Sequence, residues 1–167
     1  LGADEVARWA AEAHAVGTAA ILGSSHQVQG GDRRRTTGGC GLLSHPIGQL
    51  APVGQALGAP PECWAARSCV GIVPAANAPV RRKMLVASFY GVPGSTMDSA
   101  KLEETEAAMA ELVGRLHASG MPWILGMDAN CEAEDHGTLS QLEAAGHAVH
   151  IGGWERKGEP TYRNGVL

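Results

Sequence analysis

An amphipathic segment of 20 residues between two short apolar segments constrains the fold more than any other feature of the sequence. In residues 99–118 apolar side chains recur every three or four positions, which is the period of a helix with one buried face. Residues 83–90 (KMLVASFY) and 122–127 (PWILGM) are short and apolar, so each is predicted to be a strand, the second of them fully buried. A helix of this kind needs a sheet to cover, so helices and strands must pack together.

Weaker patterns along the rest of the chain predict further elements. The predicted helices are residues 3–15 and 138–145, and the predicted strands are residues 18–24, 40–45, 67–73 and 147–151. Residues 24–39 are polar and flanked by glycines, which predicts a loop or a hairpin, and the proline-rich residues 46–61 are assigned no regular structure. A capping box between Thr138 and Gln141 is expected to open the last helix. Strands that follow one another in the middle of the chain favour a mixed sheet with helices outside it over a purely parallel sheet.

Length and composition narrow the class of protein. The chain has 167 residues, enough for one domain, and its 44% hydrophobic and 18% charged residues are typical of a globular protein. No apolar segment approaches the roughly 20 residues of a membrane span, so no membrane is expected as a partner. The net charge of −4 gives no overall attraction to nucleic acid. The four cysteines, at positions 40, 63, 69 and 131, include no Cys-x-x-Cys pair, which favours small buried thiols over a disulfide set or a zinc site.

The strand predicted at residues 122–127 ends in polar side chains that form the first candidate site. Residues 123–131 read WILGMDANC, so the apolar run ends in Asp128 and Asn130. Side chains two positions apart on an extended chain point the same way, and open sheets bind ligands at the carboxyl ends of their strands. A carboxylate there can orient or deprotonate a water, and an amide can donate to a phosphate oxygen. The alternative is a plain turn, because Asp and Asn both bond readily to nearby backbone.

Three other groups of polar residues have both a functional and a structural interpretation. Tyr90 ends the strand before the long helix, where its phenol can donate to an anionic oxygen or can simply pack. The densest basic run, Arg33, Arg34 and Arg35, can contact a nucleic-acid backbone or can remain solvated in a loop. Residues 134–136 (Glu-Asp-His) are interpreted as a solvated loop rather than a second metal site.

Four ordered segments of the chain resemble motif blocks of the endonuclease/exonuclease/phosphatase superfamily, which includes apurinic-site endonucleases and the endonuclease domains of non-LTR retrotransposons. The segments are GGCGLLSH (38–45), LVASFYGVPG (85–94), WILGMDANC (123–131) and EPTYRN (159–164). Their order, with a long helix between the second and the third, carries the resemblance over nearly the whole chain. It implies an α+β fold, the DNase-like four-layered α/β/β/α sandwich of two mixed sheets, present here as a single, incomplete domain over residues 1–167.

The same resemblance implies a function. Members of the superfamily are hydrolases, so the expected activity is that of a Mg²⁺-dependent phosphodiesterase, a nuclease that hydrolyses nucleic acid through a water nucleophile. Asp128 would orient or activate the water, Asn130 would hold the phosphate and help position that carboxylate, and Tyr90 would contact the scissile phosphate. The expected cofactor is Mg²⁺ or Mn²⁺, the expected partner is nucleic acid, and the expected state is a monomer. Lipid and inositol phosphatases share this fold, and a non-catalytic α/β binding or structural domain is the alternative from another class.

The chain also departs from the family pattern. The family's upstream Asn and metal-binding Glu would precede the first helix, and its Asp-His ending would follow Leu167; neither block is in this sequence. No metal ligand is therefore assigned to this chain. Met127 and Ala129 stand where the family has a small Gly and commonly a Phe. Because loss of one member of a cooperating catalytic set typically costs orders of magnitude in rate, this fragment is expected to be inactive or nearly so.

Overall fold

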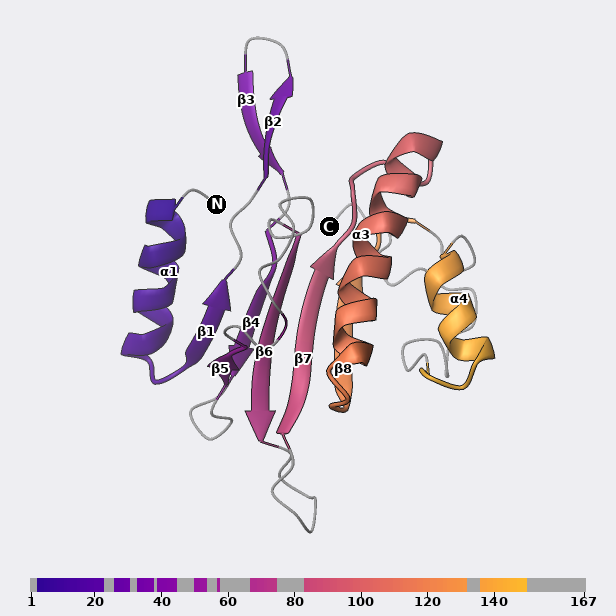
Figure 1. Ribbon diagram of the computed structural model, residues 1–167. Helices are drawn as coiled ribbons and strands as arrows, with labels where there is room; N and C mark the ends of the chain where they lie inside the picture. The colour runs from indigo at the N-terminus through magenta and orange to yellow at the C-terminus, as the bar shows by residue number, and fades with distance from the viewer. Residues whose placement is uncertain are drawn as a thin grey trace, which may run out of the picture.

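The computed structural model describes residues 3–22, 26–30, 33–37, 39–44, 50–53, 57, 67–74, 83–131 and 136–149. The α-helices within these residues are α1 (Ala3–Ala15), α3 (Ser99–Ala118) and α4 (Gly137–Ala144). The strands are β1 (Ala19–Leu22), β2 (His26–Gly30), β3 (Arg33–Thr37), β4 (Gly41–Ser44), β5 (Ala51–Pro52), β6 (Ser68–Pro74), β7 (Lys83–Tyr90) and β8 (Trp123–Asp128). The described structure is thus a mixed α+β protein, as predicted (Figure 1). None of its helices is long and apolar enough to cross a membrane.

A four-stranded sheet with the order β5-β6-β7-β8 is the largest sheet among the described residues. Strand β6 pairs antiparallel with β5 and β7, whereas β8 lies parallel to β7. The parallel pair is possible because α3 returns the chain from the end of β7 to the start of β8. This sheet is therefore mixed, as predicted, while the two-stranded sheets β1-β4 and β2-β3 are antiparallel.

The long helix α3 has the predicted bounds and packs its apolar face on the sheet. The Asp98 carboxylate accepts a hydrogen bond from the Ala100 N–H at 3.1 Å and so caps the start of the helix. The buried side chains of this contact are Met109, Leu112, Val113 and Leu116 on the helix and Leu85, Ala87 and Phe89 on β7. Each large apolar side chain buried in this way contributes about 1.5–3 kcal/mol to stability. The contact between α3 and β7 is therefore the core that holds the end of β7 in place.

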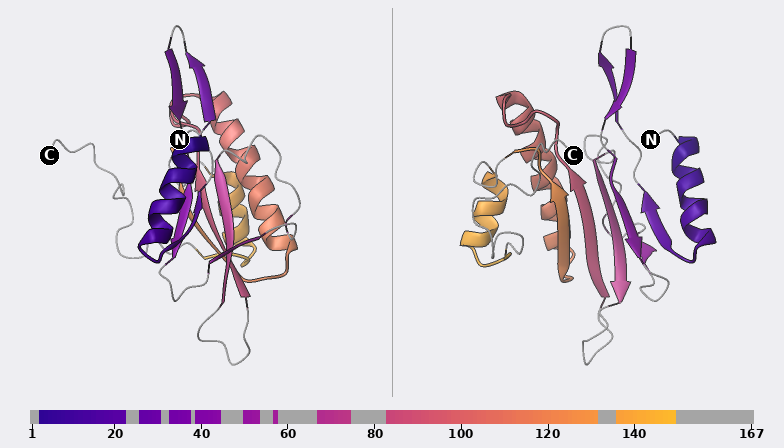
Figure 2. Two further views of the ribbon diagram at one scale, coloured as in Figure 1. Left: turned by 90° about the vertical axis from the view of Figure 1, so that its left-hand side faces the viewer. Right: turned by 180° about the vertical axis from the view of Figure 1, so that it is seen from behind.

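The opposite face of the four-stranded sheet is approached by β1. A Cβ atom at Gly71 in β6 would lie 2.9 Å from Ile21 Cδ1 of β1 and 2.4 Å from Leu50 Cδ1, so the glycine leaves the space that these side chains fill. Helix α1 lies on the outer side of β1, away from α3 and α4 (Figures 1 and 2). The arrangement is compatible with a sandwich of sheets between helices.

Three predictions about strands and loops need correction. Strand β8 is not fully buried: among the described residues it pairs only with β7, and Ile124 is 46% exposed. Residues 147–149 form no strand, and the last two residues of the predicted strand 147–151 lie outside the described residues. The segment 46–61 contains the two-residue strand β5. The polar segment 24–39 contains the β2-β3 hairpin, so the hairpin alternative holds.

The predicted cap of the last helix is also wrong, because its partner comes from another helix. The Thr138 N–H and hydroxyl both donate to Glu106 Oε2 of α3, at 3.1 and 2.9 Å, rather than forming a capping box with Gln141. Glu106 is thereby half-buried. His136, expected in a solvated loop, is fully buried, and residues 134 and 135 lie outside the described residues.

Burial as predicted holds for one of the three described cysteines, all of which are thiols. Cys69 is buried, whereas Cys40 and Cys131 are half-buried. Cys63 and the EPTYRN segment (159–164) lie outside the described residues.

Candidate functional site

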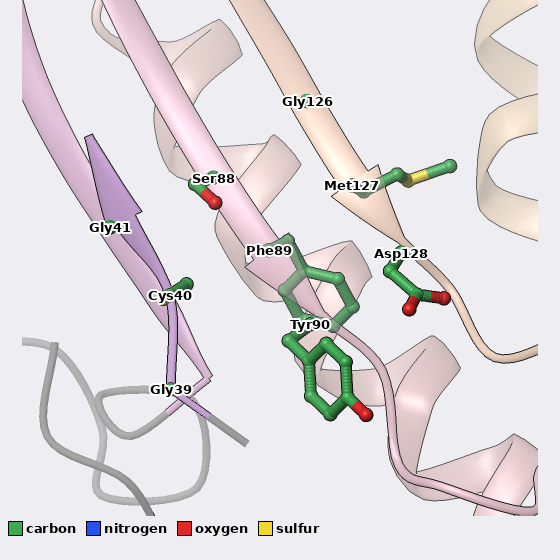
Figure 3. Close-up of a pocket in the computed structure, with 9 residues that line it drawn as sticks. All are labelled: Gly39, Cys40, Gly41, Ser88, Phe89, Tyr90, Gly126, Met127 and Asp128. Carbon is green, nitrogen blue, oxygen red and sulfur yellow. The ribbon is translucent and has the colours of Figure 1, made fainter. Parts of the chain in front are cut away.

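The parallel pairing of β7 and β8 brings Tyr90 and Asp128 together. The two residues are register partners at the carboxyl ends of their strands, and the Gly91 N–H donates to the Asp128 carbonyl at 2.7 Å. Neighbouring strands lie about 4.8 Å apart, so the two side chains leave the sheet next to each other. Tyr90 is half-buried and Asp128 is exposed, and Figure 3 shows them at the ends of adjacent strands. A phenol and a carboxylate predicted from separate segments therefore share one edge of the sheet.

Immediately after Asp128 the chain turns. The Asn130 N–H donates to Asp128 Oδ1 at 3.1 Å, and Asn130 has a φ of 54°, a left-handed conformation that asparagine tolerates better than most residues. The turn alternative of the sequence analysis is thus present. The rule that residues two apart project the same way holds for extended backbone, so it does not extend from Asp128 to Asn130.

The Asn130 side chain ties this turn to the residue that follows Tyr90. Its Nδ2 donates to the Gly91 carbonyl at 3.0 Å, and the backbone carbonyl of Asn130 accepts from the Thr96 hydroxyl at 3.0 Å. A Cβ at Gly91 would lie 2.1 Å from the Ala129 carbonyl oxygen, so only glycine allows the turn to sit this close. The two site segments, which are far apart in the sequence, are therefore held in direct contact.

Arg67 is a buried cation behind the site that sequence reasoning did not single out. It is only 4% exposed; its carbonyl accepts from the Tyr90 N–H at 2.8 Å, and its Nη1 donates to the Gly91 carbonyl at 3.4 Å. Its Nη2 lies 3.7 Å from Glu104 Oε1, which is on the exposed side of α3. No local pattern marks this arginine, because its partners belong to β7 and α3. It supports the backbone on which Tyr90 sits.

A buried hydroxyl pair fixes the loop between β7 and α3. The Val92 N–H donates to Thr105 Oγ1 at 2.9 Å, Ser95 Oγ donates to the Val92 carbonyl at 2.6 Å, and the two hydroxyl oxygens lie 3.0 Å apart. Because buried polar groups with satisfied partners are rigid, this network keeps the loop after Tyr90 in one position.

Three segments of the chain line one shallow pocket of about 320 Å³ at this edge of the sheet. They are residues 39–41 at the start of β4, residues 88–90 at the end of β7, and residues 126–128 at the end of β8 (Figure 3). Each belongs to a different one of the segments 38–45, 85–94 and 123–131 that the sequence analysis singled out. The volume is at the lower end of ligand-binding cavities.

The pocket wall carries little charge. Asp128 is the one carboxylate among the lining residues, and a side-chain hydrogen bond with Cys69, together with burial, raises the pKa of the Cys40 thiol far above its usual range, so Cys40 is neutral. Among the residues that the structure describes, no group of three or more His, Cys, Asp or Glu side chains is arranged to hold a metal ion. The described site can therefore hydrogen-bond a ligand, but it does not assemble a metal centre.

The arginine run lies in β3, the second strand of the β2-β3 hairpin, and not in a loop. The side chains of Arg33, Arg34 and Arg35 are not described. The hairpin extends beyond the rest of the described structure and leads into β4, whose first residues line the pocket (Figures 1 and 2).

The chain has no significant match among protein-family models, characterised proteins or solved structures.

Proposed function

We propose that the chain is a partial endonuclease/exonuclease/phosphatase domain whose pocket binds the phosphodiester of a nucleic acid. The observation that carries the proposal is the meeting of residues 39–41, 88–90 and 126–128 at one pocket. Each segment belongs to a different block of the resemblance, and α3 lies between the Tyr90 and Asp128 strands as in that family's order. In this assignment the β1-β4 and β5–β8 sheets, with α1 and α3, are part of an incomplete DNase-like sandwich.

Tyr90 and Asp128 on the pocket wall, and Asn130 in the turn beside it, have distinct roles in this proposal. The Tyr90 hydroxyl donates to a non-bridging phosphate oxygen, and the Asp128 carboxylate accepts a hydrogen bond from a water and orients it toward phosphorus. The Asn130 N–H, which donates to Asp128 Oδ1, holds that carboxylate in one rotamer. Asparagine Nδ2 carries two hydrogens; one is used on the Gly91 carbonyl, and the other is left for a phosphate oxygen.

The described residues of the site supply few ligands for a divalent cation. Mg²⁺ in proteins is bound through one or two carboxylates plus substrate phosphates, and Asp128, the one carboxylate on the wall of this pocket, supplies only the smaller of these numbers. The described residues also lack a group of three metal-ligating side chains. The Mg²⁺ or Mn²⁺ expected for an intact domain would need ligands from outside them. We therefore expect the chain to bind a phosphodiester and to hydrolyse it at, or close to, the uncatalysed rate.

Nucleic acid is the favoured ligand because the arginine hairpin joins the pocket wall. Strand β3 contains three consecutive arginines and ends two residues before Gly39, which lines the pocket. Contacts between arginine side chains and the phosphates of a nucleic acid supply an affinity that falls steeply as the salt concentration rises. The second candidate is a non-catalytic structural domain, favoured by the hydrogen bond from the Asn130 N–H to Asp128, which closes a turn without any ligand.

Fluorescence anisotropy with a short DNA duplex that carries an abasic site tests the proposal. The chain should bind the duplex, with an affinity that falls as salt rises, and Tyr90→Phe should weaken binding by about tenfold to a hundredfold, the value of one hydrogen bond to a charged group. Replacing Arg33, Arg34 and Arg35 together by glutamine should flatten the salt dependence. Lys83→Gln, an exposed position at the opposite end of β7, is the control and should leave binding nearly unchanged.

The same duplex with Mg²⁺ or Mn²⁺ tests the expected lack of activity. Cleavage above the protein-free blank that Asp128→Ala abolishes would overturn the expectation of an inactive chain. Binding of an inositol phosphate in place of DNA would move the substrate class to the lipid and inositol phosphatases. Absence of binding to either ligand at low salt would refute the proposal and favour the structural domain.

A further inference from the structure

A cysteine, a histidine and a glutamate form a linear hydrogen-bonded series beside the Asp128–Asn130 turn. Cys131 directly follows Asn130, and its Sγ lies 3.1 Å from His136 Nε2. The other ring nitrogen, His136 Nδ1, is hydrogen-bonded to Glu106 Oε1 on α3. Glu106 Oε2 is held in turn by the N–H and the hydroxyl of Thr138. Both oxygens of the carboxylate are thereby fixed in position.

These partners determine where the protons lie. A carboxylate only accepts hydrogen bonds, so Glu106 selects the tautomer of His136 that carries a proton on Nδ1. In that tautomer Nε2 has a lone pair that faces the Cys131 sulfur, and it can accept the thiol proton. The products are a thiolate and an imidazolium, and the Glu106 carboxylate stabilises the imidazolium. A thiol, a histidine in contact with it and a third group that orients the histidine are the arrangement that activates cysteine nucleophiles.

Burial and exposure are distributed as this chemistry requires. His136 is 0% exposed, so its charge interactions are not weakened by water. Cys131 is only half-buried, so the residue is partly open to a small reagent. Capping of α4 does not explain the series, because the Thr138 contacts alone cap the helix through Glu106. The contacts from His136 to Cys131 and to Glu106 are additional.

We propose that Cys131 is a reactive thiol, activated by His136 and oriented through Glu106, whose chemical targets are soft electrophiles of the hydroperoxide class. In this reaction the Cys131 proton passes to His136 Nε2, and the thiolate sulfur attacks the terminal peroxide oxygen. The O–O bond breaks as the S–O bond forms. Sulfur loses two electrons, the peroxide gains them, and the alkoxide or hydroxide that leaves takes the proton back from His136. The products are cysteine sulfenic acid and an alcohol or water.

Site-resolved mass spectrometry of the intact chain, treated with iodoacetamide or with hydrogen peroxide and dimedone, tests this proposal. At neutral pH an unactivated thiol such as glutathione is only a few per cent thiolate, so a larger thiolate fraction raises the rate of Cys131 above that of glutathione. A thiolate of lower pKa is a weaker nucleophile, which offsets part of this gain. Cys131 should therefore react about tenfold faster than glutathione. Cys40 is the control within the same chain, because the raised pKa of its thiol should make it slow. A Cys131 rate no faster than that of glutathione would overturn the proposal.

Two variants test the role of His136. His136→Gln should bring the Cys131 rate down to that of glutathione and make it rise with pH across the neutral range, where the wild-type rate is nearly flat. Glu106→Gln, which keeps the size of the side chain, should also lower the Cys131 rate. This variant provides the test if His136→Gln does not fold. His147→Gln, at an exposed histidine, is the matched control and should change nothing. Fast labelling of Cys131 that persists in a folded His136 or Glu106 variant would refute the activation.

Discussion

Replacing Gly91 by alanine should disrupt the site although none of its polar side chains is substituted. A Cβ at residue 91 would lie 2.1 Å from the Ala129 carbonyl oxygen and 2.6 Å from the Ala129 carbonyl carbon, both of them backbone atoms. To avoid this overlap the turn after β8 has to move. The move strains or breaks the bond from the Gly91 N–H to the Asp128 carbonyl and the bond from Asn130 Nδ2 to the Gly91 carbonyl.

The expected cost follows from these contacts. Two hydrogen bonds contribute about 1 kcal/mol each, and forcing a methyl group into packed backbone costs about 1–3 kcal/mol. Gly91→Ala should therefore lower the free energy of unfolding by about 3–5 kcal/mol, a large part of the stability of a typical domain. Urea denaturation followed by circular dichroism measures this difference.

Gly126→Ala is the matched control, because Gly126 lines the same pocket but its Cβ would meet only the Ala87 carbonyl oxygen, 4.0 Å away. This control should change stability by no more than about 1 kcal/mol. Equal stabilities for the Gly91 and Gly126 variants would show that the Ala129 backbone does not lie as close to Gly91 as described.

Three further changes have expected outcomes that urea denaturation can measure. Gly114→Ala, in α3 where a Cβ would meet no atom within 4 Å, should raise stability by about 0.5–1 kcal/mol; a loss would mean that the site is less open than described. Leu112→Ala, at a core position with 0% exposure, should cost about 2–5 kcal/mol; a cost below the cost of an exposed substitution would place α3 off the sheet. Because the folded-state pKa of Cys40 is raised above its ordinary value of 9.0, the folded state keeps a proton that the unfolded state loses, so stability should fall as pH rises above that value. Cys40→Ser should reduce this slope, and an unchanged slope would argue against the contact with Cys69.

Local patterns predicted the elements whose causes are local. The bounds of α3 were predicted from a regular apolar period, and the cap that the structure adds at its start is also local, since Asp98 lies within two residues of its partner Ala100. Strand β7 was similarly predictable, because residues 83–90 form a short, mostly apolar run. Tyr90 and Asp128 were proposed as neighbours from a resemblance, and the β7-β8 register does place them side by side.

Features that depend on distant partners were not predictable in the same way. Burial of β8 depends on its place in the sheet order, which a short apolar run does not encode, so a strand that pairs only with β7 among the described residues was predicted to be fully buried. Thr138 was assigned to a local capping box, but its partner is Glu106, 32 positions earlier. The same carboxylate bonds to His136, which is buried and not solvated as the sequence analysis expected. A polar residue near a helix end carries no sign of which element will supply its partner.

The most direct test of the central claim is a nuclear magnetic resonance titration of isotope-labelled protein with a short abasic oligonucleotide. If the pocket at the ends of β7 and β8 binds a phosphodiester, the largest amide shifts should fall on residues 39–41, 88–91 and 126–131. Tyr90→Phe should reduce them. Shifts confined to other surfaces of the described structure, or the same shifts in the Tyr90 variant, would contradict the account.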